Sequence, residues 1–525
     1  MVKATLLERR TAEQSAVGSA RTCYSGSGPI VLDQETYDRR PLNEEIRKST
    51  LEAGHNTTRQ HLYFTFSLEG VSRQAIWSFL HSHPFYNSEQ VSQRYVEVKA
   101  GNFTVPQGLT EGQRQIYDEG IALTFDAYKQ LQDILRPSVE EEYLHIFPGR
   151  EKWLRDAERD KTKHLKYSSD VKKRAQEFAR YVLPVATHAH MWHTVSALTL
   201  MRMYQCADQF NVPTEQRSLV DAMVQEVVSK DPSFQKELDG LTRYGLEDSL
   251  EFKLHQEFHS DRGVSQQRLD SFRKEFDAEL AGRFSVLIGY DPKAEENLAK
   301  AVRSVLQVSK TDLPDERAME LVLNPQYNRA LGDTNNIMTF TKIGSALSAV
   351  SYTFQKRISH TADSQNQRHR MVPETTPIFN VGDVVDVVLP GIVEQNSVVR
   401  EYFMETMDKL WGVMNRLRDA EASEEAVQYL APNAIALRLV EQGDLRNRHH
   451  KYRMRLCYTA QEEIWRSCVD EAQQIAAVHP QIGKYLLPPC GVRNLAGLKP
   501  ICPEGERYCG VKVWRKEVND YERVI

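Results

Sequence analysis

The stretch His55–Arg73, HNTTRQHLYFTFSLEGVSR, carries the clearest structural signal in the sequence. Within it, His61–Ser67 alternates and is rich in residues that favour strands, so we expect a strand that ends at Gly70. NSEQVSQRY follows at Asn87–Tyr95, and apolar residues then recur at helical intervals through Thr110–Leu135. The first structural expectation is therefore a strand followed by a long helix.

Similar signals continue along the chain. Ala175–Tyr204 is expected to be helical with an interruption near Pro184, and Val384–Leu389 (VVDVVL) is strand-like. Ser423 is placed to cap a largely helical segment, Ala426–Glu471. A helix before that cap is indicated by an apolar stripe of Phe403, Met407, Leu410, Trp411, Met414 and Leu417.

The two halves show motifs in the same order, which predicts an internal duplication. SQRY at Ser92–Tyr95 and QRH at Gln367–His369 each come before a long helical pattern, and Arg180–Pro184 (RYVLP) parallels Gln428–Pro432 (QYLAP). The highly charged Glu251–Leu280 lies at the midpoint and is typical of a solvated helix or linker. We therefore expect domains at residues 1–265 and 285–525.

Composition excludes several classes of protein. The 525 residues are 41% hydrophobic and 26% charged, with a net charge of −5. This balance disfavours a nucleic-acid scaffold, and no run of 18 apolar residues predicts a membrane span. Met1–Arg10 lacks the apolar core of a secretory signal, and an odd number of cysteines, seven, fits a reducing compartment, so we expect a cytoplasmic protein.

Three cysteines gather near the end of the sequence, at Cys490, Cys502 and Cys509, among glycines and prolines that favour tight turns. Such turns can present thiolates to zinc, but the spacing lacks paired CxxC motifs and no fourth ligand is evident. Three buried thiols are therefore the favoured interpretation, a zinc site is the alternative, and no metal ligand is assigned.

Several of these segments together resemble flavin-dependent thymidylate synthases. Ser19–Ser25 (SARTCYS) resembles the family's early ARTCYS, His55–Arg73 its GHxSxxEHxxFTFxIEGVSR region, and Asn87–Tyr95 its SxxxSQRY end. In the second half, Tyr458–Ile464 (YTAQEEI) resembles the helix that carries HAQxEI. The resemblance implies an α/β (α+β) fold, a twisted sheet with long helices. It also implies that two diverged repeats form a pseudo-dimer, and that a homodimer of the chain forms a pseudo-tetramer.

The resemblance also implies an activity, the reductive methylation of dUMP to dTMP with FAD, NADPH and a methylene tetrahydrofolate donor. Arginines suit the nucleotide phosphate because they bind it bidentately. The residues that match the family's catalytic and nucleotide-binding positions are Ser92, Gln93, Arg94, Arg180, Arg446 and Arg455. Those assigned to the flavin are His55, His81, His83, Gln90 and Gln461.

The family signature R-H-R-x7-S is altered. The first half has His81-Ser82-His83, followed by eight residues before Ser92, so both arginines are missing. The literal triplet Arg368-His369-Arg370 is interpreted as the SQRY end of the second half, with Arg368 in the role of Arg94 and Asn366 in that of Ser92. Because each half lacks different parts, we expect one composite site per pair of halves.

Other interpretations stay open. The arginines could form surface ion pairs, and Arg446–Arg455 could be a solvated basic helix face. His188, His190 and His193, expected on a helix, could bind a metal, although isolated histidines without a metal are favoured. The alternatives to a thymidylate synthase are a non-catalytic nucleotide- or flavin-binding homologue and a same-fold enzyme that acts on another pyrimidine.

Overall fold

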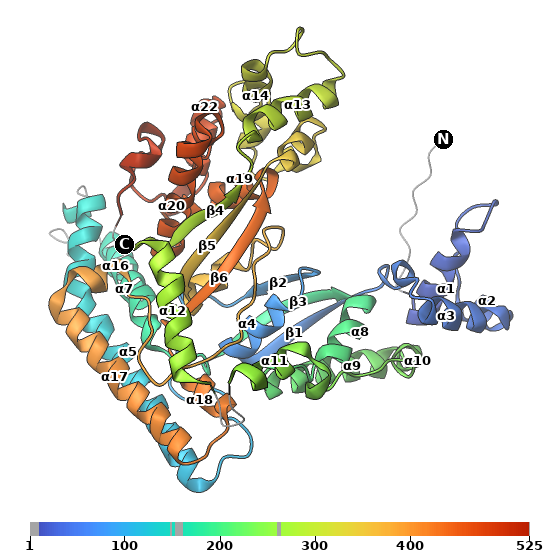
Figure 1. Ribbon diagram of the computed structural model, residues 1–525, viewed down its shortest axis with the longest axis horizontal. Coiled ribbons are helices and arrows are strands. Elements are labelled where there is room, and N and C mark those ends of the chain that lie inside the picture. The colour runs from blue at the N-terminus through green and yellow to red at the C-terminus, as the bar shows by residue number, and fades with distance from the viewer. Residues whose placement is uncertain (1–9, 148–149, 153–160, 260–263, 524) are drawn as a thin grey trace. The chain divides into compact units, whose positions relative to one another are not determined.

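The computed structural model describes residues 10–147, 150–152, 161–259, 264–523 and 525. The chain divides into two compact units, which we call unit 1 (Met1–Ser92, Val98–Pro106 and Val185–Ser265) and unit 2 (Gln93–Glu97, Gln107–Pro184 and Gln266–Ile525). Each unit contains a three-stranded antiparallel sheet and long helices (Figure 1). The α/β class expected from the sequence is confirmed.

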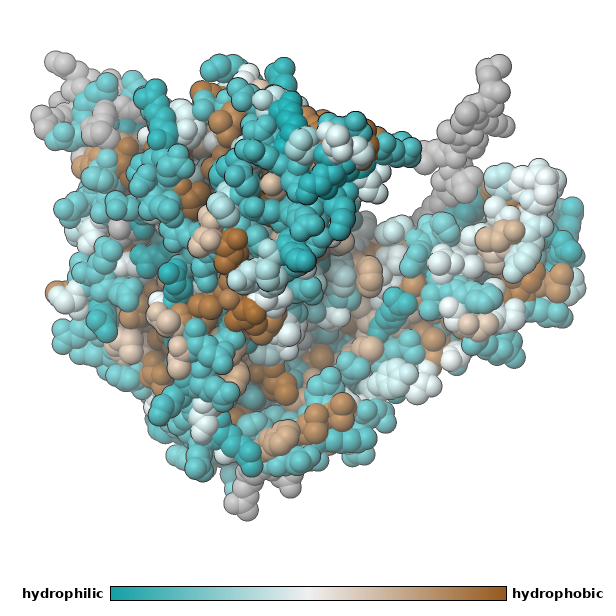
Figure 2. Space-filling model, turned by 45° about the horizontal axis from the view of Figure 1, so that its top comes forward, coloured by the Kyte–Doolittle hydropathy of each residue, from teal (hydrophilic) through white to brown (hydrophobic). Residues whose placement is uncertain are grey.

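No helix in the described part of the chain is both long and apolar enough to cross a bilayer. The face drawn in Figure 2 is mostly hydrophilic, with hydrophobic residues in scattered patches rather than in a continuous band.

Unit 1 is built around the sheet β1-β3-β2. Its elements are α1 (Ala12–Thr22), α2 (Gln34–Asp38), α3 (Leu42–Glu52), η1 (Asn56–Arg59), β1 (Tyr63–Ser72), α4 (Arg73–His81), β2 (Tyr86–Gln90), β3 (His188–Ser196), α8 (Ala197–Cys206), α9 (Thr214–Lys230), α10 (Ser233–Leu238), η4 (Leu246–Asp248) and α11 (Leu250–Phe258). The register shifts between Leu68 and Val71, where Gly70 has φ +66°. Gly70 therefore permits a β-bulge and does not end the strand as expected.

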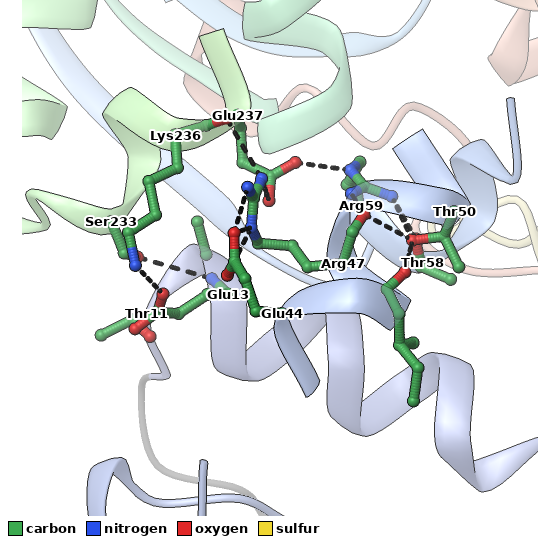
Figure 3. Close-up of polar contacts among 12 residues, drawn as sticks. Thr11, Glu13, Glu44, Arg47, Thr50, Thr58, Arg59, Ser233, Lys236 and Glu237 are labelled. Carbon is green, nitrogen blue, oxygen red and sulfur yellow. Dashed lines mark hydrogen bonds and ion pairs between the residues drawn. The ribbon is translucent and has the colours of Figure 1, made fainter. Parts of the chain in front are cut away.

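Buried ion pairs join the N-terminal helices of unit 1 to α10 (Figure 3). The Nε of Arg59 lies 2.7 Å from Oε2 of Glu237, and Nη1 of Arg47 lies 3.2 Å from Oε1 of the same carboxylate. The side chain of Glu237 is 1% exposed. Glu237 thus pairs with an arginine of α3 and one of η1, and Arg47 also pairs with Glu44 at 2.7 Å. These contacts fix α3 and η1 against α10.

Unit 2 is built around the sheet β4-β5-β6. Its elements are α5 (Glu111–Ile146), α7 (Lys161–Ala179), η3 (Arg180–Val182), α12 (Gln266–Leu280), β4 (Ser285–Tyr290), α13 (Ala294–Leu306), α14 (Asp315–Leu323), η5 (Arg329–Gly332), η6 (Ile337–Phe340), η7 (Ile343–Ala349), β5 (Ser351–Ser359), α15 (His360–Asn366), α16 (Gly391–Gln395), α17 (Ser397–Asp419), α18 (Glu424–Leu430), β6 (Ala436–Asp444), α19 (Leu445–Arg455), α20 (Glu462–Val478), α21 (Pro480–Gly483), α22 (Pro489–Leu495), η8 (Gly505–Arg507), η9 (Val513–Arg515) and η10 (Val518–Asp520).

The long helices α5 and α17 lie side by side and antiparallel (Figure 1). The hydroxyl of Tyr402 donates to Gln130 at 2.6 Å, and Arg416 pairs with Glu119 at 2.7 Å, so residue numbers rise along one helix as they fall along the other. The apolar stripe predicted for α17 is buried. These two helices are the long helices expected in the two halves, and they pack on each other.

The sheets of the two units repeat one local design. β1 runs into α4 and β5 runs into α15, and in each case a serine, Ser72 or Ser359, caps the helix by accepting from the third following amide. β3 and β6 lead into α8 and α19 in the same way, with Ser196 and Asp444 as the caps. The pairing of β1 with β3 matches the pairing of β5 with β6. This correspondence supports the predicted duplication.

The parallel motifs RYVLP and QYLAP pair with each other inside unit 2. Pro184 and Pro432 form an antiparallel bridge, the amide of Asn433 donates to the carbonyl of Leu183 at 2.8 Å, and that of Ala434 donates to Tyr181 at 2.9 Å. Equivalent segments that pair antiparallel are what a local two-fold axis produces. The contact therefore supports a pseudo-dimer of the two repeats.

Three predicted elements differ in the structure. Residues 188–196 form the strand β3 within the expected helix, 436–444 form the strand β6 within another, and Val384–Leu389 contributes only an isolated bridge from Val387 to Ile435. His188 and His193 therefore lie on a strand, on opposite faces. Pairing with neighbouring strands outweighs local helical periodicity here. Helices are confirmed at the charged midpoint and after Ser423.

Candidate functional site

Unit 2 contains a cleft of about 300 Å³ beside α5 and α7. Its lining residues are Arg94, Tyr95, Tyr143, Phe147, Arg150, Lys166, Asp170, Lys173, Arg174, Glu177, Thr459, Glu504, Arg507, Tyr508 and Cys509. Six of these side chains are cationic and three are acidic. The excess of positive charge and the four aromatic rings suit a small anionic ligand with a planar group.

The SQRY segment is held at this cleft by contacts to α7 and to the connection after α19. Arg94 pairs with Glu177, Nε to Oε1 at 2.9 Å, and donates from Nη2 to the carbonyl of Thr459 at 2.9 Å. The neighbouring Gln93 accepts at its carbonyl from Gln176 at 3.0 Å and at its side chain from Asn433 at 3.2 Å. Residues from both predicted repeats therefore fix the position of Arg94.

Glu177 faces more positive charge than it can neutralise. Burial alone would raise its pKa, but the charges of Arg94, Arg180 and Arg174 lower it below the usual value. Burial lowers the pKa values of Arg174 and Arg180, and of Arg523 to about 10, and the charge of Arg94 lowers each further. Asp170 also attracts Arg174 and Glu462 attracts Arg523, but the four arginines still carry an excess of positive charge that an anion would neutralise.

Arg455 brings the second repeat to the same region. Burial lowers its pKa to about 10, and repulsion from Arg368 and Arg94 adds to this. Its Nε donates to Nε2 of His369 at 2.8 Å, and its Nη1 donates to Gln365 at 3.1 Å. Burial and the adjacent Arg455 hold the pKa of His369 well below its usual range, so the ring accepts this bond as a neutral imidazole.

The triplet Arg368–Arg370 lies where the family signature is expected. It follows α15 and precedes Glu374, which bridges to Glu441 of β6. In unit 1, His81–His83 occupy the same place, at the end of α4 and before β2, which pairs with β3. The interpretation of this triplet as the SQRY end, with Asn366 in the place of the serine, is therefore wrong, because Asn366 is the last residue of α15. The second half keeps the RHR that the first half has lost.

The three histidines assigned to the flavin lie in unit 1. His55 is exposed at the start of η1. Nδ1 of His81 lies 2.7 Å from the carbonyl of Trp77, one turn earlier in α4, and Nδ1 of His83 accepts from the amide of Phe85 at 3.1 Å. Their assignment to a cofactor stays a prediction.

The remaining predicted residues are distributed over both units. Ser92 is half-buried at the end of a unit 1 segment, and Gln90 is buried in β2, where it accepts from Arg73 at 3.3 Å. In unit 2, Arg446 donates to the carbonyl of Thr339. The guanidinium of Arg446 therefore binds the backbone of its own repeat. Its role in nucleotide binding stays a prediction.

Gln461 has a structural position at the start of α20. Its Oε1 accepts from the amide of Ile464 at 3.4 Å, which caps the helix, and its Nε2 donates to the hydroxyl of Tyr181. That hydroxyl donates to Glu463 at 2.6 Å, and Glu463 also accepts from the amide of Ser359 at 2.6 Å. The AQEE motif thus joins α20 to η3 and β5.

Glu462, beside Gln461, has an unusual charge state. Burial raises its pKa to about 7 although Arg466 and Arg523 attract its charge. Protonation of this carboxyl therefore stabilises the fold fully below about pH 4.5, and the contribution is lost as the pH rises through 7.

We expect the free energy of unfolding to fall by up to about 3 kcal/mol more in the wild type than in Glu462→Gln between pH 4.5 and 8. Urea unfolding across this range measures the difference. Glu394→Gln is the control, because Glu394 contacts the same Arg466 but is 59% exposed. Parallel pH profiles of wild type and Glu462→Gln would contradict the assignment.

Three residues of the cluster around Glu177 escaped the sequence-based prediction. Arg174 and Glu177 precede Arg180 at steps of three residues, a spacing that places helical side chains on one face. That periodicity was the available signal. Arg523 lies two residues before the end of the sequence, and no motif distinguishes it.

Comparison with known proteins identifies the family of the chain. The model of the thymidylate synthase complementing protein family matches residues 5–233 and 286–481, one segment in each half. A flavin-dependent thymidylate synthase of Clostridium tetani is 28% identical over 242 residues, which are 45% of this chain and 86% of the relative. One of Geobacter sulfurreducens is 31% identical over 145 residues, 25% of this chain and 58% of the relative.

A longer alignment is found with the UPF0159 protein Ta1429 of Thermoplasma acidophilum, which is 22% identical over 319 residues, 60% of both chains. The family match covers most of the sequence and recurs in both halves. The chain therefore belongs to the thymidylate synthase complementing protein family, as two diverged tandem copies.

Proposed function

We propose that the chain binds a deoxyuridine monophosphate in the unit 2 cleft and methylates it reductively, with a flavin, a methylene folate donor and NADPH. The observation that carries the proposal is the convergence of Arg94 and Arg180 from the first repeat with Arg455 from the second. Arg180 and Arg455 both lie close enough to Arg94, which lines the cleft, for the charges to repel. Glu177 pairs with Arg94 at 2.9 Å and attracts Arg180.

The chemistry of the cleft suits a nucleotide monophosphate. A phosphate dianion would neutralise the uncompensated arginines and restore their pKa values, and arginine binds phosphate bidentately. Nη2 of Arg180 is buried and has no hydrogen-bond partner within the described residues, so it is available to such a ligand. The rings of Tyr95 and Tyr508 at the cleft provide faces on which a pyrimidine can stack.

The same cleft fits the diphosphate of a flavin dinucleotide. Arg150, Lys166, Lys173 and Arg507 line it with cations that remain partly or fully exposed. A bound flavin would supply the hydride for the reduction. The residues of the chain would bind and orient the nucleotide, and the arginines would stabilise its negative charge.

We infer a composite site because each half lacks different residues of the family motifs. The first repeat contributes Arg94 and Arg180, while the second contributes Arg455 and the signature-like Arg368–Arg370. A homodimer would then place four repeats together. The altered His81–His83 favours the second candidate, a homologue that binds nucleotide without turnover.

Absorption spectroscopy and release of tritium from C5-labelled dUMP test the proposal. We expect purified protein to show the flavin absorption bands, or to gain them with added FAD, and to release tritium when folate and NADPH are present. Flavin and nucleotide binding without tritium release would support the non-catalytic homologue. A colourless protein that takes up no FAD would contradict a flavin enzyme.

A further inference from the structure

Four cysteines come together behind the cleft, one more than the sequence indicates. Cys457, in the connection between α19 and α20, lines the same small cavity as Cys490 of α22, Cys502 and Cys509. The cavity has a volume of about 10 Å³, enough for roughly one water-sized atom. Cys457 is the fourth sulfur that a closed tetrathiolate site requires.

Among the described residues, no lysine or arginine lines this cavity. Its other lining residues are Tyr458, Thr459, Pro488, Pro489, Pro503, Glu504, Tyr508 and Val513. All seven cysteines of the chain are free. Four grouped thiols with largely apolar walls and no disulfide are the environment that a metal ion converts to thiolates.

We propose that Cys457, Cys490, Cys502 and Cys509 ligate a thiophilic metal centre, either one zinc ion or an iron–sulfur cluster. Both use four cysteine thiolates. Within the described residues, no three of these sulfur atoms all lie within 4.8 Å of one another. Four sulfurs around one zinc ion are about 3.8 Å apart. Zinc binding would therefore draw the four thiols closer together, whereas an iron–sulfur cluster is larger and would keep them further apart.

The position of this centre gives it a structural task. In the described residues after α22, the regular elements are the short helices η8, η9 and η10, and a metal crosslink would hold such a segment in place. Thr459, Glu504, Tyr508 and Cys509 line both the cysteine cavity and the basic cleft, and Thr459 accepts from Arg94. The centre would therefore hold the C-terminal segment at the wall of the nucleotide cleft.

Elemental analysis of the full chain, purified without oxygen and without added metal, tests the proposal. We expect either about one zinc per chain or iron together with acid-labile sulfide and visible absorption. The first result would identify a zinc site and the second an iron–sulfur cluster. X-ray absorption at the edge of the metal found should show a shell of sulfur alone. Protein that contains neither metal, and whose four thiols all react with a thiol reagent in the native state, would overturn the proposal.

Serine variants assign the ligands. Cys457→Ser should lower the metal content at least severalfold and lower the melting temperature. Cys206→Ser is the matched control, because Cys206 is also partly buried but lies on α8 of unit 1, outside the cavity. Full metal content in Cys457→Ser would remove Cys457 from the site and overturn the tetrathiolate. If that variant fails to fold, the X-ray absorption spectrum of the wild-type protein tests the four-sulfur site by itself.

Discussion

Arg455→Ala should weaken the binding of dUMP by about as much as Arg94→Ala, although the two arginines come from different repeats. A hydrogen bond to a charged group is worth about 1.5–3 kcal/mol, which corresponds to a loss of roughly 10- to 150-fold in affinity. The reason is that Arg455 lies close enough to Arg94 for the charges to repel each other. Isothermal titration with dUMP measures both dissociation constants.

The comparison variant is Arg446→Ala, which removes an arginine from the same helix, α19. Arg446 donates to the carbonyl of Thr339, so we expect a much smaller loss of affinity. Melting temperatures of all three variants establish that each is folded. Unchanged affinity in Arg455→Ala, with a loss in Arg94→Ala, would discard the composite site while leaving a site within the first repeat possible.

Glu237→Ala should lower the free energy of unfolding of unit 1 by about 3–5 kcal/mol. The substitution removes the only carboxylate that contacts Arg59 within the described residues, and the side chain of Arg59 is 2% exposed. Loss of one partner from a buried ion pair leaves the other charge without compensation in a medium of low polarity. Urea unfolding followed by circular dichroism measures this change.

Glu35→Ala provides the matched control in the same unit. Glu35 pairs with Arg39, but both side chains are about 70% exposed, so its removal should cost at most about 1 kcal/mol. Replacing Arg59 and Glu237 together by methionine should recover part of the loss, because the charge of Arg59 is removed with its partner and Arg47 keeps its pair with Glu44 at 2.7 Å. Equal effects of Glu35→Ala and Glu237→Ala would show that burial does not determine the strength of these pairs.

The sequence was informative wherever the structure depends on residues close together in the chain. The strand of His61–Ser67, the long helix after Thr110 and the cap at Ser423 are confirmed, because alternation, helical spacing and capping are local properties. Elements whose pairing partners are distant were missed. Residues 188–196 and 436–444 look helical by periodicity, but pairing with β1 and β5 makes them strands.

The candidate site divides in the same way. Motifs alone identified Arg94, Arg180 and Arg455 as candidate ligand-binding residues, and the order of motifs predicted the duplication that the family match supports. Only the tertiary structure placed Arg94 and Arg180 around Glu177, with Arg455 near Arg94. It also placed Arg368–Arg370 directly after α15 and brought Cys457 to the C-terminal cysteines. Spacing along the chain specifies helices, strands and caps, whereas the field around a buried charge depends on side chains that folding brings together from hundreds of residues apart.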